Sequence, residues 1–229
     1  MIAMRPEVES IVHQQQAVLP KVEMVDYQPE PEGEGITLEF RLCYRGPLPS
    51  ETSHPRVGHK NRIRKVFHSQ LVEYWEHSPY LKSHVLTARN EYCNLFKTVS
   101  GNNHIWRFVP LIGKENSTSC SLDILFLRRD FPGGVVRHGG DIDNRLKVLF
   151  DALKRPSEPG DLEDRAPGPD EDPLFCLLED DRYIDRFTVI TDRLLTPQES
   201  DEKEHDVVLV IHVKTTVFSP AYNSFWCAY

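Results

Sequence analysis

The residues from Asp141 to Lys154 have the types and spacing of a metal-assisted phosphodiester site. Asp141 and Asp143 are separated by one residue where a Gly-Gly loop leads into a helical pattern, so both carboxylates can point at one hard cation. Lys147 follows Asp143 by four residues, which places a cation one helical turn away. A second acidic cluster, Glu179-Asp180-Asp181, can complete the oxygen shell that Mg²⁺ requires. Carboxylates and a lysine, without a nearby thiol or histidine cluster, indicate metal-dependent phosphodiester chemistry.

Other interpretations of the Asp-x-Asp pair are weaker. A calcium EF-hand needs an oxygen ligand, a Gly and a Glu at positions that here hold Arg145, Leu146 and Ala152, which excludes it. An aspartate-nucleophile phosphatase has its Asp-x-Asp directly after an apolar strand, whereas residues 137–140 form a loop sequence. The simplest alternative is that one Asp only caps the helix, since Asp is among the preferred N-cap residues. Lys147 and the second acidic cluster favour the metal site over the cap.

This block resembles the RusA family of Holliday junction resolvases. The family motif reads Asp-x-Asp-Asn, then a Lys three residues later, then Phe-Asp-Ala-Leu and, after a turn, Asp-Asp-x-x-Val/Ile. The matching residues here are Asp141, Asp143, Asn144, Lys147, Phe150, Asp151, Ala152, Leu153, Asp180, Asp181 and Ile184.

The resemblance implies a homodimeric endonuclease that uses Mg²⁺, with Mn²⁺ expected to substitute, and resolves four-way DNA junctions by paired nicks. It implies that Asp141, Asp143 and Asp181 are metal ligands and that Lys147 is a catalytic lysine. Whether Glu179 or Asp180 replaces Asp181 as a ligand stays open. We expect Asp151 to support the site by bonding Lys147 or a backbone group. The chain departs from the family pattern in an acidic, Pro-rich insert at 156–173 and in a longer N-terminus.

The distribution of charge reconciles a net charge of −8 with a DNA partner. Residues 23–34, 156–173 and 199–206 contribute −5, −6 and −4, and without them the rest of the chain carries +7. These acidic stretches are typical of solvated loops, which could also recruit a protein partner. For the insert 156–173 we expect a mobile loop without a stable fold, whose charge repels ordinary duplex.

Two groups of basic residues are candidates for contacts with DNA phosphates. The first precedes or opens a helix, and the second lies in the segment leading to Asp141; an ordinary solvated helix face is the alternative for the first group. The candidates are Lys60, Arg62, Arg64, Lys65, Arg128, Arg129 and Arg137.

The hydrophobic pattern predicts an α+β domain with a mixed four- to five-stranded sheet and two or three helices, as in a RusA-like fold. The predicted strands are 36–44, 105–112, 121–127, 183–194 and 207–218, and the predicted helices are 61–77, 80–97 and 142–155.

The domain should span 35–219, with a peripheral, partly disordered segment at 1–34 and a tail at 220–229. Five widely spaced cysteines, an odd number, are typical of reduced thiols in a cytoplasmic protein. No run of eighteen apolar residues occurs, so no membrane association is expected.

Two further functions stay open beside junction resolution. A nuclease of the same fold could act on flaps or forks. A non-catalytic module could bind junctions and recruit a protein partner through its acidic loops.

Overall fold

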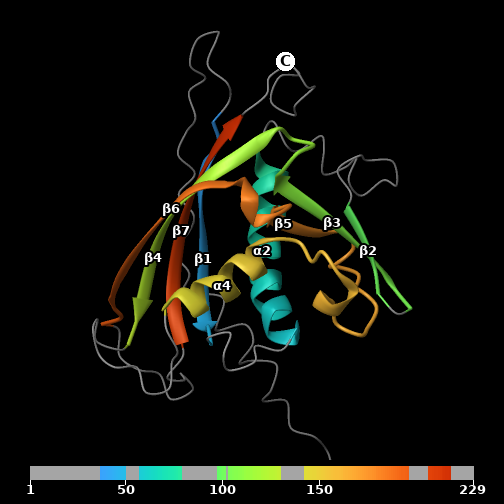
Figure 1. Ribbon diagram of the computed structural model, residues 1–229, viewed down its shortest axis with the longest axis horizontal. Coiled ribbons are helices and arrows are strands. Elements are labelled where there is room, and N and C mark those ends of the chain that lie inside the picture. The colour runs from blue at the N-terminus through green and yellow to red at the C-terminus, as the bar shows by residue number, and fades with distance from the viewer. Residues whose placement is uncertain are drawn as a thin grey trace, which may run out of the picture. The chain divides into compact units, whose positions relative to one another are not determined.

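The computed structural model describes residues 37–49, 57–78, 97–101, 103–129, 142–195 and 206–217. All of them belong to one compact unit, Pro31–Tyr229. They form a mixed α+β structure, which confirms the predicted class, with two α-helices and two mixed β-sheets (Figure 1). Several predicted features lie outside these residues: the segment 1–34, the helix over 80–97 except its last residue, Arg137, Asp141 and the tail 220–229.

The larger sheet has four strands in the order β1-β7-β4-β6. Strand β7 (Asp206–Val217) lies antiparallel to both β1 (Glu39–Pro47) and β4 (Thr118–Arg128), and β6 (Ile184–Arg193) lies parallel to β4. Alternate residues of β7 are buried because successive side chains point to opposite faces of a sheet. That buried face carries the main core of the molecule.

The smaller sheet has three strands in the order β2-β3-β5. Strand β2 (Lys97–Ser100) is antiparallel to β3 (Ile105–Ile112), which is parallel to β5 (Leu174–Leu178). The larger sheet has the predicted mixed character and strand number, but the sequence did not predict this second sheet of three strands. All five residues of β5 are buried, so this strand lacks the alternation that marks a half-exposed strand.

Two helices pack against strands of both sheets. Helix α2 (Val57–His77) buries Ile63, Phe67, Leu71 and Trp75, which are spaced at every fourth residue and so lie on one face. It packs against β1 of one sheet, β5 of the other and α4. No helix among the described residues is long and apolar enough to cross a membrane.

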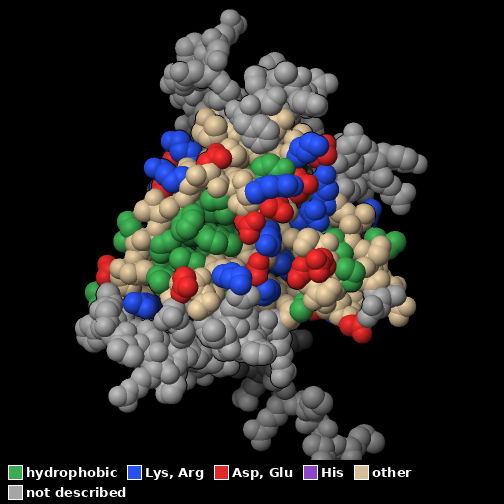
Figure 2. All heavy atoms as spheres, in the orientation of Figure 1, with side chains coloured by type: hydrophobic (Ala, Val, Ile, Leu, Met, Phe, Trp, Pro, Cys, Tyr) green, Lys and Arg blue, Asp and Glu red, His purple; other side chains and the backbone are tan. Residues whose placement is uncertain are grey.

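Helix α4 (Ile142–Leu153) carries the sequence motif and lies beside β6. Its buried residues include Val148, Leu149 and Leu153. The Phe150 ring contacts Phe187 of β6 edge to face, with 5.2 Å between ring centroids. Figure 2 shows hydrophobic side chains gathered on this side of the molecule, over the region of α4, β4 and β6 in Figure 1.

The acidic insert 156–173 is held against the domain, so the expected mobile loop is wrong. Leu162 is buried with Val99, Trp106 and Phe108 of the smaller sheet in a second apolar cluster. Glu171 is buried as well and bonds Arg165 within the insert. Acidic residues that pair with cations need not remain solvated, so an acidic, Pro-rich composition does not by itself make a segment a mobile loop.

Candidate functional site

The start of α4 presents two of the predicted catalytic side chains to solvent. Asp143 lies in the first turn, where a carboxylate is favoured by the helix dipole and by the unbonded N–H groups. Lys147 lies one turn later and is also exposed. The helix begins at Ile142, so Asp141 immediately precedes it, just outside the described residues. The helix therefore holds Asp143 and Lys147 with the spacing on which the sequence argument depended.

Arg145 fixes this turn of α4 to the sheet, a role that the sequence did not reveal. Its side chain is fully buried, and its Nε donates to the carbonyl oxygen of Leu48 at 2.7 Å. Its guanidinium also lies over the ring of Phe126 on β4, 5.2 Å from the centroid. Because Arg145 points into the protein, Asp143 and Lys147 are displayed on a rigid turn.

The other end of α4 carries a chain of alternating charges. Asp151 bonds Lys60 of α2 at 2.5 Å and Lys154 at 3.1 Å. The Lys154 ammonium also lies 3.3 Å from a carboxylate oxygen of Asp181. Asp151 therefore forms ion pairs with both Lys60 and Lys154.

This chain of charges fixes the protonation states of its central members. Burial raises the pKa of Asp151, but hydrogen bonds and charges from Lys60 and Lys154 outweigh it and lower the pKa below its ordinary value. Burial likewise lowers the pKa of Lys154, and Asp151 and Asp181 outweigh it and raise the pKa. Both groups therefore stay charged at neutral pH.

Arg64 closes the C-terminal end of α4. It is 3% exposed, and its Nε and Nη2 donate to the carbonyl oxygens of Lys154 at 3.2 Å and Asp151 at 2.8 Å. Its Nη1 donates to the side chain of Asn61. The carbonyls at a helix C-terminus lack partners within the helix and favour a cation, so Arg64 has a structural task.

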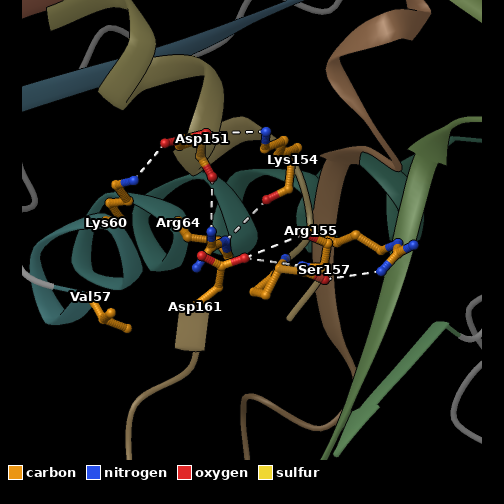
Figure 3. Close-up of a pocket in the computed structure, with 9 residues that line it drawn as sticks. Val57, Lys60, Arg64, Asp151, Lys154, Arg155, Ser157 and Asp161 are labelled. Atoms are coloured by element: carbon orange, nitrogen blue, oxygen red, sulfur yellow. Dashed lines mark hydrogen bonds and ion pairs between the residues drawn. The ribbon is translucent and has the colours of Figure 1, made fainter. Parts of the chain in front are cut away.

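A small pocket opens beside this charge network. Figure 3 shows Lys60 and Arg64 from α2 facing Asp151 of α4 and Lys154, which follows the helix, with Asp161 of the insert nearby. The pocket has a volume of about 140 Å³ and contains four cationic and two acidic side chains. Its lining residues are Val57, Lys60, Arg64, Asp151, Lys154, Arg155, Pro156, Ser157 and Asp161.

The second acidic cluster divides its three side chains among different tasks. Glu179 accepts a hydrogen bond from the backbone N–H of Lys114 at 2.9 Å and lies 3.5 Å from the ammonium of Lys97. Asp180 caps the short 3₁₀ turn Asp181–Tyr183 by accepting from the backbone N–H of Arg182. Asp181 is the most exposed of the three, and of the cluster it has the carboxylate best placed to meet a ligand.

The described residues do not assemble the predicted three-carboxylate metal site. Asp181 lies beside the C-terminal end of α4, and the helix axis rises about 15 Å between Asp143 and Leu153. Ligands of one Mg²⁺ lie about 2.1 Å from the ion, so their oxygens are only a few ångströms apart. Among the described residues, no group of three Asp, Glu, His or Cys side chains could hold a metal ion. The hard oxygen of Asp143 suits Mg²⁺, and the second ligand predicted beside it is Asp141.

The structure divides the predicted DNA-contacting residues into accessible and inaccessible ones. Arg64 and Arg128 are buried, which removes them from any surface that DNA phosphates could contact. Lys60 and Lys65 are paired with Asp151 and Glu171. Arg62 is exposed on α2, and Arg129 is partly exposed after β4. Burial of Arg64 and Arg128 could not be read from the charge pattern.

Comparison with models of known protein families, with curated proteins and with solved structures produced no match for this chain. The likeness to the RusA resolvases therefore rests on the sequence motif alone.

Proposed function

We propose that this chain is a divalent-metal-dependent endonuclease that acts on branched DNA as a homodimer, with four-way junctions as its preferred substrate. The observation that carries this proposal is the start of α4. There an exposed carboxylate, Asp143, follows Asp141 by two residues and precedes the exposed Lys147 by one helical turn. A protein that only binds DNA gains nothing from carboxylates that face phosphates, because like charges repel.

The proposed roles follow from the chemistry of each group. Asp141 and Asp143 would hold Mg²⁺, which when bound supplies Lewis-acid polarisation of the phosphodiester and activation of water. Lys147, on the same side of the helix, would place its ammonium against the negative charge that develops on the phosphate. Asp181 remains the motif's candidate for a third ligand, although the described geometry pairs it with Lys154.

The charge network at the far end of α4 would serve DNA binding. Lys60 and Lys154 share Asp151, and with the buried Arg64 set aside three cations, Lys60, Lys154 and Arg155, and two acids line the adjacent pocket. A backbone phosphate that docks there would be positioned by charge without reading the base sequence. The pocket lies at the C-terminal end of α4 and the proposed metal site at its start. Because one helix joins them, a phosphate bound in the pocket would set the position of the DNA at the proposed metal site.

The test is a cleavage assay with purified protein and a labelled four-way junction, a flap, a fork and a linear duplex, each with Mg²⁺ or EDTA. We expect paired nicks in the junction with Mg²⁺ and none with EDTA. Preferred cleavage of the flap or fork would keep the nuclease and change its substrate. Junction binding without cleavage of any substrate in Mg²⁺ or Mn²⁺ would refute the proposal and favour a non-catalytic binding module.

A further inference from the structure

Strand β6 is an edge of the larger sheet. It pairs with β4 on one side, and among the described residues no strand pairs with its other side. An edge strand presents a row of unpaired backbone N–H and C=O groups that can pair with another strand. Natural edges are usually protected by a proline, charged side chains, a β-bulge, a short length or a covering segment. The ten residues of β6 contain no proline.

Strand β6 exposes two large apolar side chains, although contact with water favours polar side chains at a sheet edge. Phe187 is 53% exposed and Ile190 is 62% exposed, and they lie on opposite faces of the strand. Phe187 contacts Phe150 of α4, and Figure 2 shows hydrophobic side chains over the region of α4, β4 and β6. A ten-residue edge with exposed apolar side chains between charged ends can acquire a partner strand.

The charges of β6 indicate which partner fits. Arg186 lies near the start of the strand and Asp192 near its end, and both are exposed. If a second copy of β6 pairs antiparallel with the first and the two-fold axis passes at Val189, Arg186 lies directly opposite the partner's Asp192. The same register sets Asp185 opposite the partner's Arg193, although Asp185 lies at a β-bulge and also accepts a hydrogen bond from Ser119.

No neighbouring register has this property. An axis at Thr188 would place Arg186 opposite the partner's Ile190, and an axis at Ile190 would place Asp192 opposite the partner's Thr188. Opposite charges directly across an antiparallel pair are stabilising, whereas like charges are destabilising. The charge pattern therefore selects one register of self-association.

We propose that β6 pairs antiparallel with β6 of a second copy about an axis at Val189, which joins two four-stranded sheets into one sheet of eight strands. The pairing is isologous, so each charge pair occurs twice in the dimer. A two-fold axis perpendicular to the sheet keeps both α4 helices on the same face. This inference supplies the interface for the homodimer and rests on that part of the proposed function, but it does not depend on nuclease activity.

The test uses two charge variants and their mixture, with molar mass measured by sedimentation or light scattering across the micromolar range. Arg186→Asp makes both positions acidic and Asp192→Arg makes both basic, so each variant alone sets like charges opposite each other twice per dimer. We expect each variant to raise the dimer dissociation constant about tenfold or more. An equimolar mixture restores complementary pairs and should form a heterodimer with nearly the affinity of the unmodified dimer.

The control is Asp123→Arg, a charge reversal at an exposed position on β4, one strand in from the edge. It should leave the dimer intact. A monomeric unmodified protein, or a dimer that Arg186→Asp and Asp192→Arg leave unchanged, would overturn the proposal. A dimer that responds as expected but cuts no DNA would uphold this interface and refute the nuclease.

Discussion

Glu171→Gln should destabilise the protein, because this carboxylate ties the acidic insert to α2. The Glu171 side chain is 9% exposed and contacts Arg165 at 2.6 Å, Lys65 at 2.5 Å and the backbone N–H of Gly168 at 2.7 Å. The hydrogen bonds from Arg165 are the main cause that lowers the pKa of Glu171 from 4.5 to about 2. Burial acts in the opposite direction, and hydrogen bonds from Lys65 and the backbone of Gly168 add to the lowering. Glu171→Gln is therefore the most direct test of whether the insert is part of the fold.

The size of the effect follows from that pKa. The difference between 4.5 and about 2 corresponds to about 3.4 kcal/mol if solvent does not screen the charges. Arg165 and Lys65 are 36% and 43% exposed, so screening reduces the expected loss at neutral pH to about 1–2 kcal/mol. The folded-state pKa is depressed, so this stability is fully present above pH 4.5 and is lost as the pH falls toward 2.

The assay is urea unfolding of the unmodified protein and of Glu171→Gln at neutral pH and at about pH 3. The difference in the free energy of unfolding should be largest at neutral pH and shrink at the acidic pH. Glu158→Gln, an exposed position in the same insert, is the matched control and should have little effect. A Glu171→Gln protein with unchanged stability at neutral pH would show that the ion pairs do not hold the insert.

Three further predictions concern the helices and the insert. Arg62→Gln should weaken junction binding and reduce the slope of log affinity against log salt by about 1, measured by fluorescence anisotropy, and an unchanged slope would remove Arg62 from the DNA surface. Arg145→Leu should lower the free energy of unfolding by about 2–3 kcal/mol, because the carbonyl of Leu48 loses its buried donor; a loss below about 0.5 kcal/mol in urea unfolding would contradict this role. Replacing 157–172 with a Gly/Ser linker should lower the melting temperature, because the buried Leu162 is removed from its apolar cluster, and an unchanged melting temperature would restore the view of a detached loop.

The elements with strong local patterns could be predicted from the sequence. Strand β3 was predicted with the bounds that it has, Ile105–Ile112; β7 differs from its prediction by one residue at each end and α4 by two residues at its C-terminal end. In these segments β-branched and aromatic residues, or apolar residues at helical spacing, dominate the local pattern. Strand β5 was missed because five consecutive apolar residues have no periodicity, and its neighbours along the chain are acidic and Pro-rich.

The candidate site could be predicted only where its residues are close in sequence. The spacing of Asp143 and Lys147 is a property of one helix and was correctly placed on α4. The burial of Arg64 depends on carbonyls of Asp151 and Lys154, which are about ninety residues away, and no local pattern encodes such a contact. The same holds for Asp181, whose position beside Lys154 results from the path of the insert and β5.

The most direct test of the proposed nuclease is cleavage of a labelled four-way junction by Asp143→Asn beside Asp123→Asn. Asp143→Asn keeps the shape of the side chain and removes the charge, so it should lower the Mg²⁺-dependent cleavage rate about 100-fold or more while junction binding is kept or becomes tighter. Asp123→Asn removes another exposed carboxylate, on β4, and should cut like the unmodified protein. Full cleavage by Asp143→Asn at ordinary Mg²⁺ concentrations would contradict the metal site at the start of α4 and the function built on it.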